Sequence, residues 1–287
     1  MTPHLLIAGN GYLGQAVADQ ARQRGWQFTT LSKSGDHADH ECDFTDQQTL
    51  RDLSKKTSPP THLLASASSG RGGPQAYQKI FLNGTKNLVE TFPQAPLTFI
   101  SSTSVYRHTD GSIVDETSDY AGETETSAIL RQAEKIALAV HGTVLRLSGI
   151  YGPDRSVILR KFLNNKATLE ETPAESSSDQ NLCANLGIRI LNQIHRDDAA
   201  RAILHLIEHQ QTGLFNVTDN QPTTQLETYQ QLSQKLNKPL PPTAPPNPNS
   251  KRGWTHKAIS NTKLRATGWQ PHYPSFLSAI DDLLSDS

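Results

Sequence analysis

The chain of 287 residues lacks most features of secreted, metal-binding or membrane proteins. It has two cysteines, Cys42 and Cys183, so neither a disulfide framework nor a cysteine metal cluster is expected. Its eleven histidines are scattered, without the spacing of a zinc site. No apolar run approaches the ~20 residues of a membrane span, and the short run at 5–8 lacks the flanks of a signal peptide. We therefore expect a cytoplasmic protein without a metal.

Charge of one sign does not dominate either. The chain carries 27 lysines and arginines against 28 aspartates and glutamates, and the basic residues form no stripe or cluster. This balance argues against nucleic acid or an anionic membrane as a partner. The expected partner is a small molecule, and the length allows one large α/β domain or a domain with a smaller lobe.

The most informative stretch lies near the start, where an apolar run at 4–8 leads into Gly9-Asn10-Gly11-Tyr12-Leu13-Gly14 and a helical pattern follows. Strand, tight glycine turn and helix form the layout that binds a dinucleotide pyrophosphate. Gly9 lets the chain turn, Gly11 lets backbone approach the phosphates, and Gly14 lets the helix pack against the strand. The helix start offers N–H groups and a positive dipole end to the anion. These six residues are the predicted pyrophosphate site.

Strand and helix patterns alternate over the first half of the chain. We expect strands at 4–8, 26–31, 62–66, 97–101 and 143–147, and helices at 14–24, 75–92 and 127–140. Such alternation predicts right-handed βαβ units and a parallel sheet covered on both faces. The predicted fold class is α/β, a Rossmann-type doubly wound parallel sheet with a smaller C-terminal substrate lobe.

The regular alternation of strand and helix patterns ends after about Tyr151. Residues 169–185 are polar and aperiodic, which indicates a mobile loop or small insertion, and the proline-rich stretch 239–248 indicates an extended arm. Between and beyond them we expect strands at 189–194 and 214–217 and helical segments at 197–208, 224–236, 264–269 and 276–284. Residues 1–152 are the predicted dinucleotide-binding domain. Residues 153–287 are a mixed region, in which about 189–217 return to that domain and the remainder forms the substrate lobe.

Five stretches together resemble the extended short-chain dehydrogenase/reductase superfamily, in an atypical branch of its NAD(P)-dependent epimerase/dehydratase group. They lie at 9–14, 100–106 (ISSTSVY), 144–153 (VLRLSGIYGP), 192–198 (NQIHRDD) and 259–271. The resemblance implies that cofactor and substrate meet in a cleft between the sheet domain and the lobe. It also implies a homodimer.

The end of the second strand bears on the choice of cofactor. An NAD site usually has a carboxylate there, whereas this chain has Ser32 and Lys33, which suit the 2′-phosphate of NADP. NADP is therefore preferred; the alternative is that Lys33 is a solvated loop residue and Asp36 serves NAD. By resemblance, Asp43 and Phe44 contact the adenine, and Ser66-Ala67-Ser68 pass the ribose and pyrophosphate.

The catalytic pattern departs from the family, which the resemblance says uses a Tyr and a Lys four residues later in one helix. Aligned on that helix, the chain carries Thr126 and Leu130, and Phe81 stands where an active-site Asn is usual. Ser102 is present four residues before Tyr106 and is expected to orient the reacting oxygen. Ordinary Tyr–Lys proton transfer is thus in doubt.

Three side chains are candidates for the missing proton donor: Tyr106, Tyr120 and His195. Tyr106 is the tentative catalytic choice, although its hydroxyl can instead orient neighbouring groups, and Tyr120 can be a surface loop residue. Beside His195, Asp197 or Asp198 can simply cap a helix.

Tentative substrate-binding residues lie at the junction with the lobe and at 195–196. They are Arg146, Tyr151, Arg155, His195 and Arg196. For Arg146 and Arg155 a structural salt bridge is an equal alternative.

The leading hypothesis is an NAD(P)-binding, epimerase/dehydratase-like or reductase-like enzyme. It would act by hydride transfer on a small polar substrate, such as a nucleotide sugar. The alternative is a non-catalytic NADP-binding sensor or regulatory protein. A scaffold that binds no nucleotide is a third possibility, against which the intact glycine loop argues.

Overall fold

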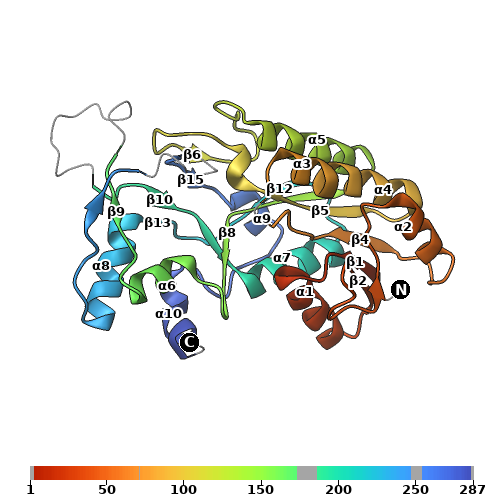
Figure 1. Ribbon diagram of the computed structural model, residues 1–287, viewed down its shortest axis with the longest axis horizontal. Helices are drawn as coiled ribbons and strands as arrows, with labels where there is room; N and C mark the ends of the chain where they lie inside the picture. Colours follow the sequence, from red (N-terminus) through yellow and green to blue (C-terminus); the bar gives the residue numbers. More distant parts are fainter. Residues whose placement is uncertain (1–2, 71, 173–185, 247–253, 286–287) are drawn as a thin grey trace.

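A seven-stranded parallel sheet lies at the centre of the computed structural model, which describes residues 3–70, 72–172, 186–246 and 254–285 (Figure 1). The strand order is β12-β7-β5-β4-β1-β2-β3, and every neighbouring pair is parallel. The strands are β1 (His4–Ala8), β2 (Gln27–Ser32), β3 (His40–Glu41), β4 (His62–Ala65), β5 (Leu97–Ser102), β7 (Thr143–Leu147) and β12 (Gly213–Val217). Strand β12, from the second half of the chain, thus pairs with β7 at one edge. This architecture confirms the predicted α/β fold.

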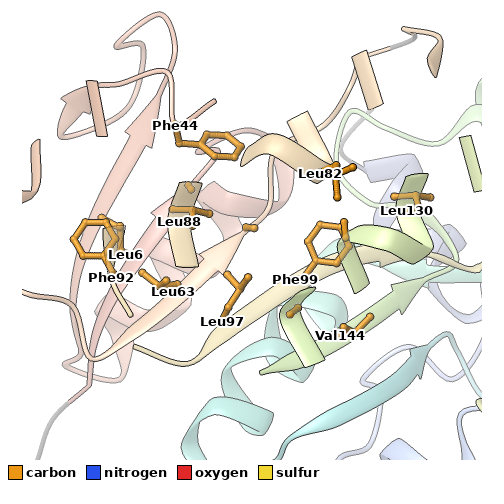
Figure 2. Close-up of a cluster of buried hydrophobic side chains, with 14 of the residues drawn as sticks. Leu6, Phe44, Leu63, Leu82, Leu88, Phe92, Leu97, Phe99, Leu130 and Val144 are labelled. Carbon is orange, nitrogen blue, oxygen red and sulfur yellow. The ribbon is translucent and has the colours of Figure 1, made fainter. Parts of the chain in front are cut away.

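Helices cover both faces of the sheet, which is why the central strands β1 and β4 are mostly apolar. One face carries α1 (Tyr12–Gln23) and α7 (Arg196–Glu208), seen below the sheet in Figure 1. The other carries α2 (Gln47–Ser54), α3 (Pro74–Tyr77), η1 (Gln78–Asn83), α4 (Gly84–Thr91) and α5 (Glu125–Ala139). Figure 2 shows the apolar cluster on this second face, with Phe99 and Val144 from the sheet facing Leu82 and Leu130 from the helices.

A third apolar cluster lies at the other end of the molecule, around α6 (Val157–Leu163), α8 (Gln225–Leu236) and α10 (Ile280–Ser285). Three short strand pairs surround it or lead to it: β8 (Gly149–Tyr151) with β11 (Gln193–His195), β9 (Leu169–Glu170) with β14 (Thr243–Ala244), and β10 (Ile190–Leu191) with β13 (Thr223–Thr224). A fourth pair, β6 (Ile113–Val114) with β15 (Ala258–Ile259), contributes Val114 and Ile259 to the apolar cluster of the second face. The remaining elements are η2 (Thr103–Val105), α9 (Thr262–Arg265) and η4 (Leu277–Ala279). Within the described residues no helix is both long and apolar enough to cross a membrane.

The structure differs from the predicted elements in several places. The helix expected at 75–92 is divided into α3, the π-helical η1 and α4, and the strand expected at 189–194 is divided into β10 and β11. Short elements β3, α2 and α6 were not predicted, because two to eight residues are too few for a clear period. In the stretch expected to be a loop, Leu169 and Glu170 pair with β14, and residues 173–185 lie outside the described part.

Candidate functional site

The glycine turn between β1 and α1 is packed so tightly that two of its glycines are sterically required. Gly9 has φ of 107°, and a Cβ there would lie 2.4 Å from the backbone N of Ala67. A Cβ at Gly14 would lie 2.3 Å from the carbonyl O of Gly9. The Ser66 hydroxyl donates to that same carbonyl at 2.8 Å. The start of α1 is therefore held against the ends of β1 and β4.

Gly11 differs from both, because a Cβ placed on it would meet nothing within 4 Å. It is the N-cap of α1, in extended conformation and without a side-chain hydrogen bond to the helix. Five other α-helices of the described chain begin with a side chain that accepts from their first N–H groups, namely those capped by Asp46, Thr124, Ser156, His195 and Thr224. The helices α3, α4 and α9 also lack such a cap. Open space before an uncapped helix start fits the pyrophosphate of a dinucleotide.

The other loop residues have distinct surroundings. Asn10 is 7% exposed, its amide donates to the carbonyl of His37, and its Oδ1 is buried without a hydrogen-bond partner among the described atoms. A buried amide oxygen without a partner is costly unless a ligand donates to it. Leu13 is 6% exposed and packs between α1 and α7, so its side chain anchors the helix.

Tyr12 links the glycine loop to the second half of the chain. Its hydroxyl donates to the carbonyl of Pro153 at 3.0 Å, and burial raises its pKa to about 12. The guanidinium carbons of Arg155 and Arg196 each lie 5.0 Å from the centre of its ring. Arg196 also pairs with Asp197 at 2.7 Å. Two predicted substrate-binding arginines thus meet beside the predicted pyrophosphate site.

The predicted adenosine end lies where β2 and β3 finish. Lys33 Nζ lies 3.4 Å from Asp43 Oδ2, and the Ser32 hydroxyl donates to the backbone carbonyl of Asp36 at 3.2 Å. Partial burial raises the pKa of Asp43, but hydrogen bonds from Thr45 and Lys33 outweigh it and leave the pKa below its usual value. Asp43 is therefore an anion shared among local donors.

A second cation, Lys79 of η1, lies 3.7 Å from the same Asp43 oxygen; the sequence analysis did not single it out. Phe44, 8% exposed, packs against Gly84, where a Cβ would lie 2.3 Å from the ring. Of the remaining predicted residues here, Ala67 touches Gly9, and the hydroxyl of Ser68 accepts from the backbone N of Gly70 at 3.2 Å.

Ser102 ends β5 and caps the short helix η2. Its hydroxyl oxygen accepts from the backbone N of Ser104 at 3.1 Å, and the side chain is half-buried. Since that contact uses only the oxygen as acceptor, the hydroxyl proton remains available to a substrate oxygen. This geometry is compatible with the orienting role predicted for Ser102.

Tyr106 is 0% exposed, which the sequence did not reveal. Its hydroxyl donates to Asn216 Oδ1 at 3.1 Å and accepts from Arg146 Nη1 at 2.7 Å. Burial raises its pKa, although the charge of Arg146 acts in the opposite direction. These partners enclose the hydroxyl, which supports the orienting alternative for Tyr106 over the tentative catalytic one.

Arg146, 1% exposed, donates to both carboxylate oxygens of Glu134, at 2.9 Å to Oε1 and 2.5 Å to Oε2. This contact is the structural salt bridge that the sequence analysis gave as the alternative role of Arg146. The ion pair accounts for the burial of the guanidinium without a substrate contact. Its Nη2 also donates to the hydroxyl of Tyr120 at 3.0 Å, and Arg131 lies 3.8 Å over that ring. Tyr120 is thus part of an inner network rather than a plain surface residue.

The helix that carries the Tyr–Lys pair in the family is α5, and its corresponding residues are engaged in structure. Thr126 lies in the first turn, 3.2 Å from the hydroxyl of Thr124, which forms a capping box with Ser127. Leu130 is 2% exposed in the apolar cluster. Neither side chain has the chemistry of the residue it replaces.

Tyr151 and His195 are also buried, at 1% and 3% exposed. The hydroxyl of Tyr151 donates to the carbonyl of Ser275 at 3.3 Å. His195 Nδ1 accepts from the backbone N of Asp197 at 3.2 Å, so the cap of α7 is His195 and neither predicted aspartate. Burial lowers the pKa of His195, although Asp197 raises it. Asp198 instead accepts from backbone N–H groups near the C-terminus.

Comparison with known proteins identifies the family of this chain. The model of the NAD dependent epimerase/dehydratase family matches residues 5–218. A 3-diazoavenalumate denitrifying reductase from a Streptomyces species is 28% identical over 154 residues, which cover 48% of this chain. The match spans about half, 46%, of that curated relative's length.

Solved structures cover almost the whole chain. An NAD-dependent epimerase/dehydratase from Methylobacillus flagellatus is 26% identical, with a TM-score of 0.74 over 99% of this chain and 98% of that one. UDP-glucose 4-epimerase of Thermus thermophilus, solved with NAD, is 20% identical with a TM-score of 0.76 over the same shares. The Thermotoga maritima UDP-glucose 4-epimerase, solved with UDP-glucose, is 17% identical with a TM-score of 0.78, again over 99% and 98%. The family match confirms the resemblance: this chain belongs to the NAD dependent epimerase/dehydratase family.

Proposed function

We propose that the chain is a reductase-like enzyme that binds NADP(H) and acts on a small polar substrate. The observation that carries this proposal is the uncapped start of α1 at Gly11, which has open space around it. Close packing at Gly9 and Gly14 holds this helix start against the sheet. The family match and the partial likeness to a reductase support hydride transfer as the reaction class.

The chain's own groups divide the work of binding. Backbone N–H groups at the start of α1 hold the pyrophosphate, and Asp43 and Phe44 hold the adenine end. Ser32 and Lys33 lie at the end of β2, where a 2′-phosphate needs donors, which favours NADP over NAD. When bound, the nicotinamide supplies or accepts a hydride.

On the substrate side, Ser102 donates a hydrogen bond to the reacting oxygen, and Arg155 and Arg196 bind polar or anionic groups of the substrate. A nucleotide sugar is one candidate, since the Thermotoga maritima epimerase of the same fold was solved with UDP-glucose. The two arginines lie beside the predicted pyrophosphate site, which supports a substrate position at the carboxyl ends of the strands.

The second candidate is a non-catalytic NADP-binding sensor. One observation favours it: Thr126 is part of the capping network of α5 and Leu130 is buried in the core, so this helix offers no acid, base or ribose-binding amine there. A cytoplasmic homodimer, with residues 1–152 binding the dinucleotide and much of 153–287 the substrate, is proposed with either function.

Calorimetric titration of the purified chain with NADPH and NADH tests the cofactor proposal. The sharpest variant is Gly11→Ala, because the added methyl meets only open space in the protein and would intrude on a bound pyrophosphate. Gly73→Ala is the matched control, since Gly73 is also an N-cap in extended conformation with nothing within 4 Å of its Cβ position. We expect Gly11→Ala to abolish binding and Gly73→Ala to preserve it. Unchanged binding in Gly11→Ala would refute the site.

Enzyme and sensor are then separated with the NADPH-bound chain. Carbonyl compounds, whose carbon can accept the hydride, are added in turn, and loss of reduced nicotinamide is followed by absorbance. Consumption that disappears in Ser102→Ala supports the enzyme. Tight NADPH binding without consumption across the panel supports the sensor.

A further inference from the structure

The Asp43–Phe44 segment is held by the helix formed from η1 and α4 through three separate contacts. Lys79 Nζ lies 3.7 Å from Asp43, Gly84 packs on the ring of Phe44, and Asn87 donates from its amide to the carbonyl of Phe44 at 3.2 Å. The part of this helix from Lys79 to Asn87 is therefore held at the predicted adenosine site, although it follows Phe44 by more than thirty residues.

Two lysines meet at one carboxylate there. Lys33 and Lys79 come from different elements, and each amine lies within 4 Å of the same oxygen of Asp43. Their side chains are 75% and 57% exposed, whereas Asp43 is 24% exposed. One carboxylate balances only one of the two positive charges, so the group carries an excess positive charge facing solvent.

We propose that Lys79 is a second specificity-determining cation for NADP, acting with Lys33 on the 2′-phosphate. A phosphate monoester carries a charge of roughly −1.5 to −2 near neutral pH, which two ammonium groups match better than one. The exposed amines exchange the single carboxylate for the phosphate when the cofactor binds. This inference rests on the proposed dinucleotide binding and adds to it a second residue that distinguishes NADP from NAD.

The position of Lys79 depends on the local helix geometry. Residues 78–83 form a π-helical segment between α3 and α4. Phe81 of this segment packs edge-on against Phe99, with 6.2 Å between the two ring centres. A π-helical turn displaces side chains from α-helical spacing, and in this register the Lys79 side chain reaches Asp43.

Four probes separate the 2′-phosphate from the rest of the cofactor: NADPH and NADH, and 2′,5′-ADP and 5′-AMP. Each pair differs in the 2′-phosphate, so calorimetric affinities report that group directly. In Lys79→Ala we expect NADPH and 2′,5′-ADP to bind about fivefold more weakly. This factor corresponds to the loss of roughly 1 kcal/mol, the upper value for an exposed ion pair. NADH and 5′-AMP should bind as before, and Lys79→Arg should restore most of the loss.

Lys86→Ala is the matched control, because Lys86 is an exposed lysine of α4, two residues after Gly84. The preference for NADPH should also weaken with added salt in the native chain and do so less steeply in Lys79→Ala. Equal effects of Lys79→Ala on NADPH and NADH, or no effect on either, would overturn the inference while dinucleotide binding stood. Failure of the native chain to bind any dinucleotide would instead refute the proposed function itself.

Discussion

Arg146 and Glu134 form an ion pair of 2.5 Å whose side chains are 1% and 4% exposed, between strand β7 and helix α5. The same carboxylate accepts from the hydroxyl of Ser101 at 2.5 Å, and the guanidinium also reaches two tyrosine hydroxyls. All of these groups surround the carboxyl ends of β5 and β7, next to Ser102. The pair thus ties the helix that frames the predicted substrate site to the sheet.

Glu134→Gln should destabilise the fold by about 3–5 kcal/mol, since it leaves a buried guanidinium without its counter-charge. The matched control is Glu123→Gln, which removes a carboxylate bonded to Arg131 at the same 2.5 Å but 52% exposed. That change should cost less than ~1 kcal/mol. Urea unfolding of both variants gives the comparison, and similar losses in the two would contradict the importance of burial.

Asp219 predicts a pH dependence of stability. Burial raises its pKa to about 8, and its Oδ1 has no partner among the described residues. In the unfolded chain the carboxyl ionises near its ordinary value of 3.8. Between these two values the native state therefore holds more protons, and its stability should fall as pH rises toward 8.

Asp219→Asn removes this titration. The free energy of unfolding, measured by urea at several pH values from 5 to about 8, should fall less steeply with pH in the variant, and the variant should be the more stable form near pH 8. Parallel curves for the two proteins would show that Asp219 is not the responsible group.

Gly14→Ala should destabilise the chain, although Gly to Ala within a helix ordinarily stabilises by about 0.8–1 kcal/mol. The new Cβ would lie 2.3 Å from the carbonyl O of Gly9, and overpacking of this kind costs roughly 1–3 kcal/mol. Thermal unfolding tests the sign of the change. Gly11→Ala in the same loop meets open space but replaces an N-cap glycine with a poorer cap, so it should lower the melting temperature less than Gly14→Ala does.

Tyr12→Phe should cost about 1 kcal/mol, the usual net value of one hydrogen bond, because the hydroxyl no longer donates to Pro153. Since the pKa of Tyr12 is raised to about 12, this cost should not vary with pH up to 9 or so. Tyr12→Leu also removes the ring between Arg155 and Arg196 and should cost more. Equal losses in the two variants would mean that the arginine contacts contribute nothing.

Much of the fold could be predicted from the sequence because its signals are local. The apolar run at 4–8, the spacing of Gly9, Gly11 and Gly14, and the helical period at 127–140 each act within a few residues, and β1, the glycine turn and α5 form there. The same locality explains the misses: α2 and α6 are too short to show a period, and η1 departs from α-helical spacing inside a helix that looked continuous.

The candidate site likewise has features that the sequence predicts and features that only the tertiary structure reveals. The spacing of Gly9, Gly11 and Gly14, and the absence of a Tyr–Lys pair at Thr126 and Leu130, are properties of the sequence itself. Only the tertiary structure decided that Tyr106 is enclosed, that Arg146 pairs with Glu134, and that Lys79 joins Lys33 at Asp43. These contacts join residues 10 to 110 positions apart through the order of strands in the sheet, and burial and pairing at such distances follow from packing, which no local pattern encodes.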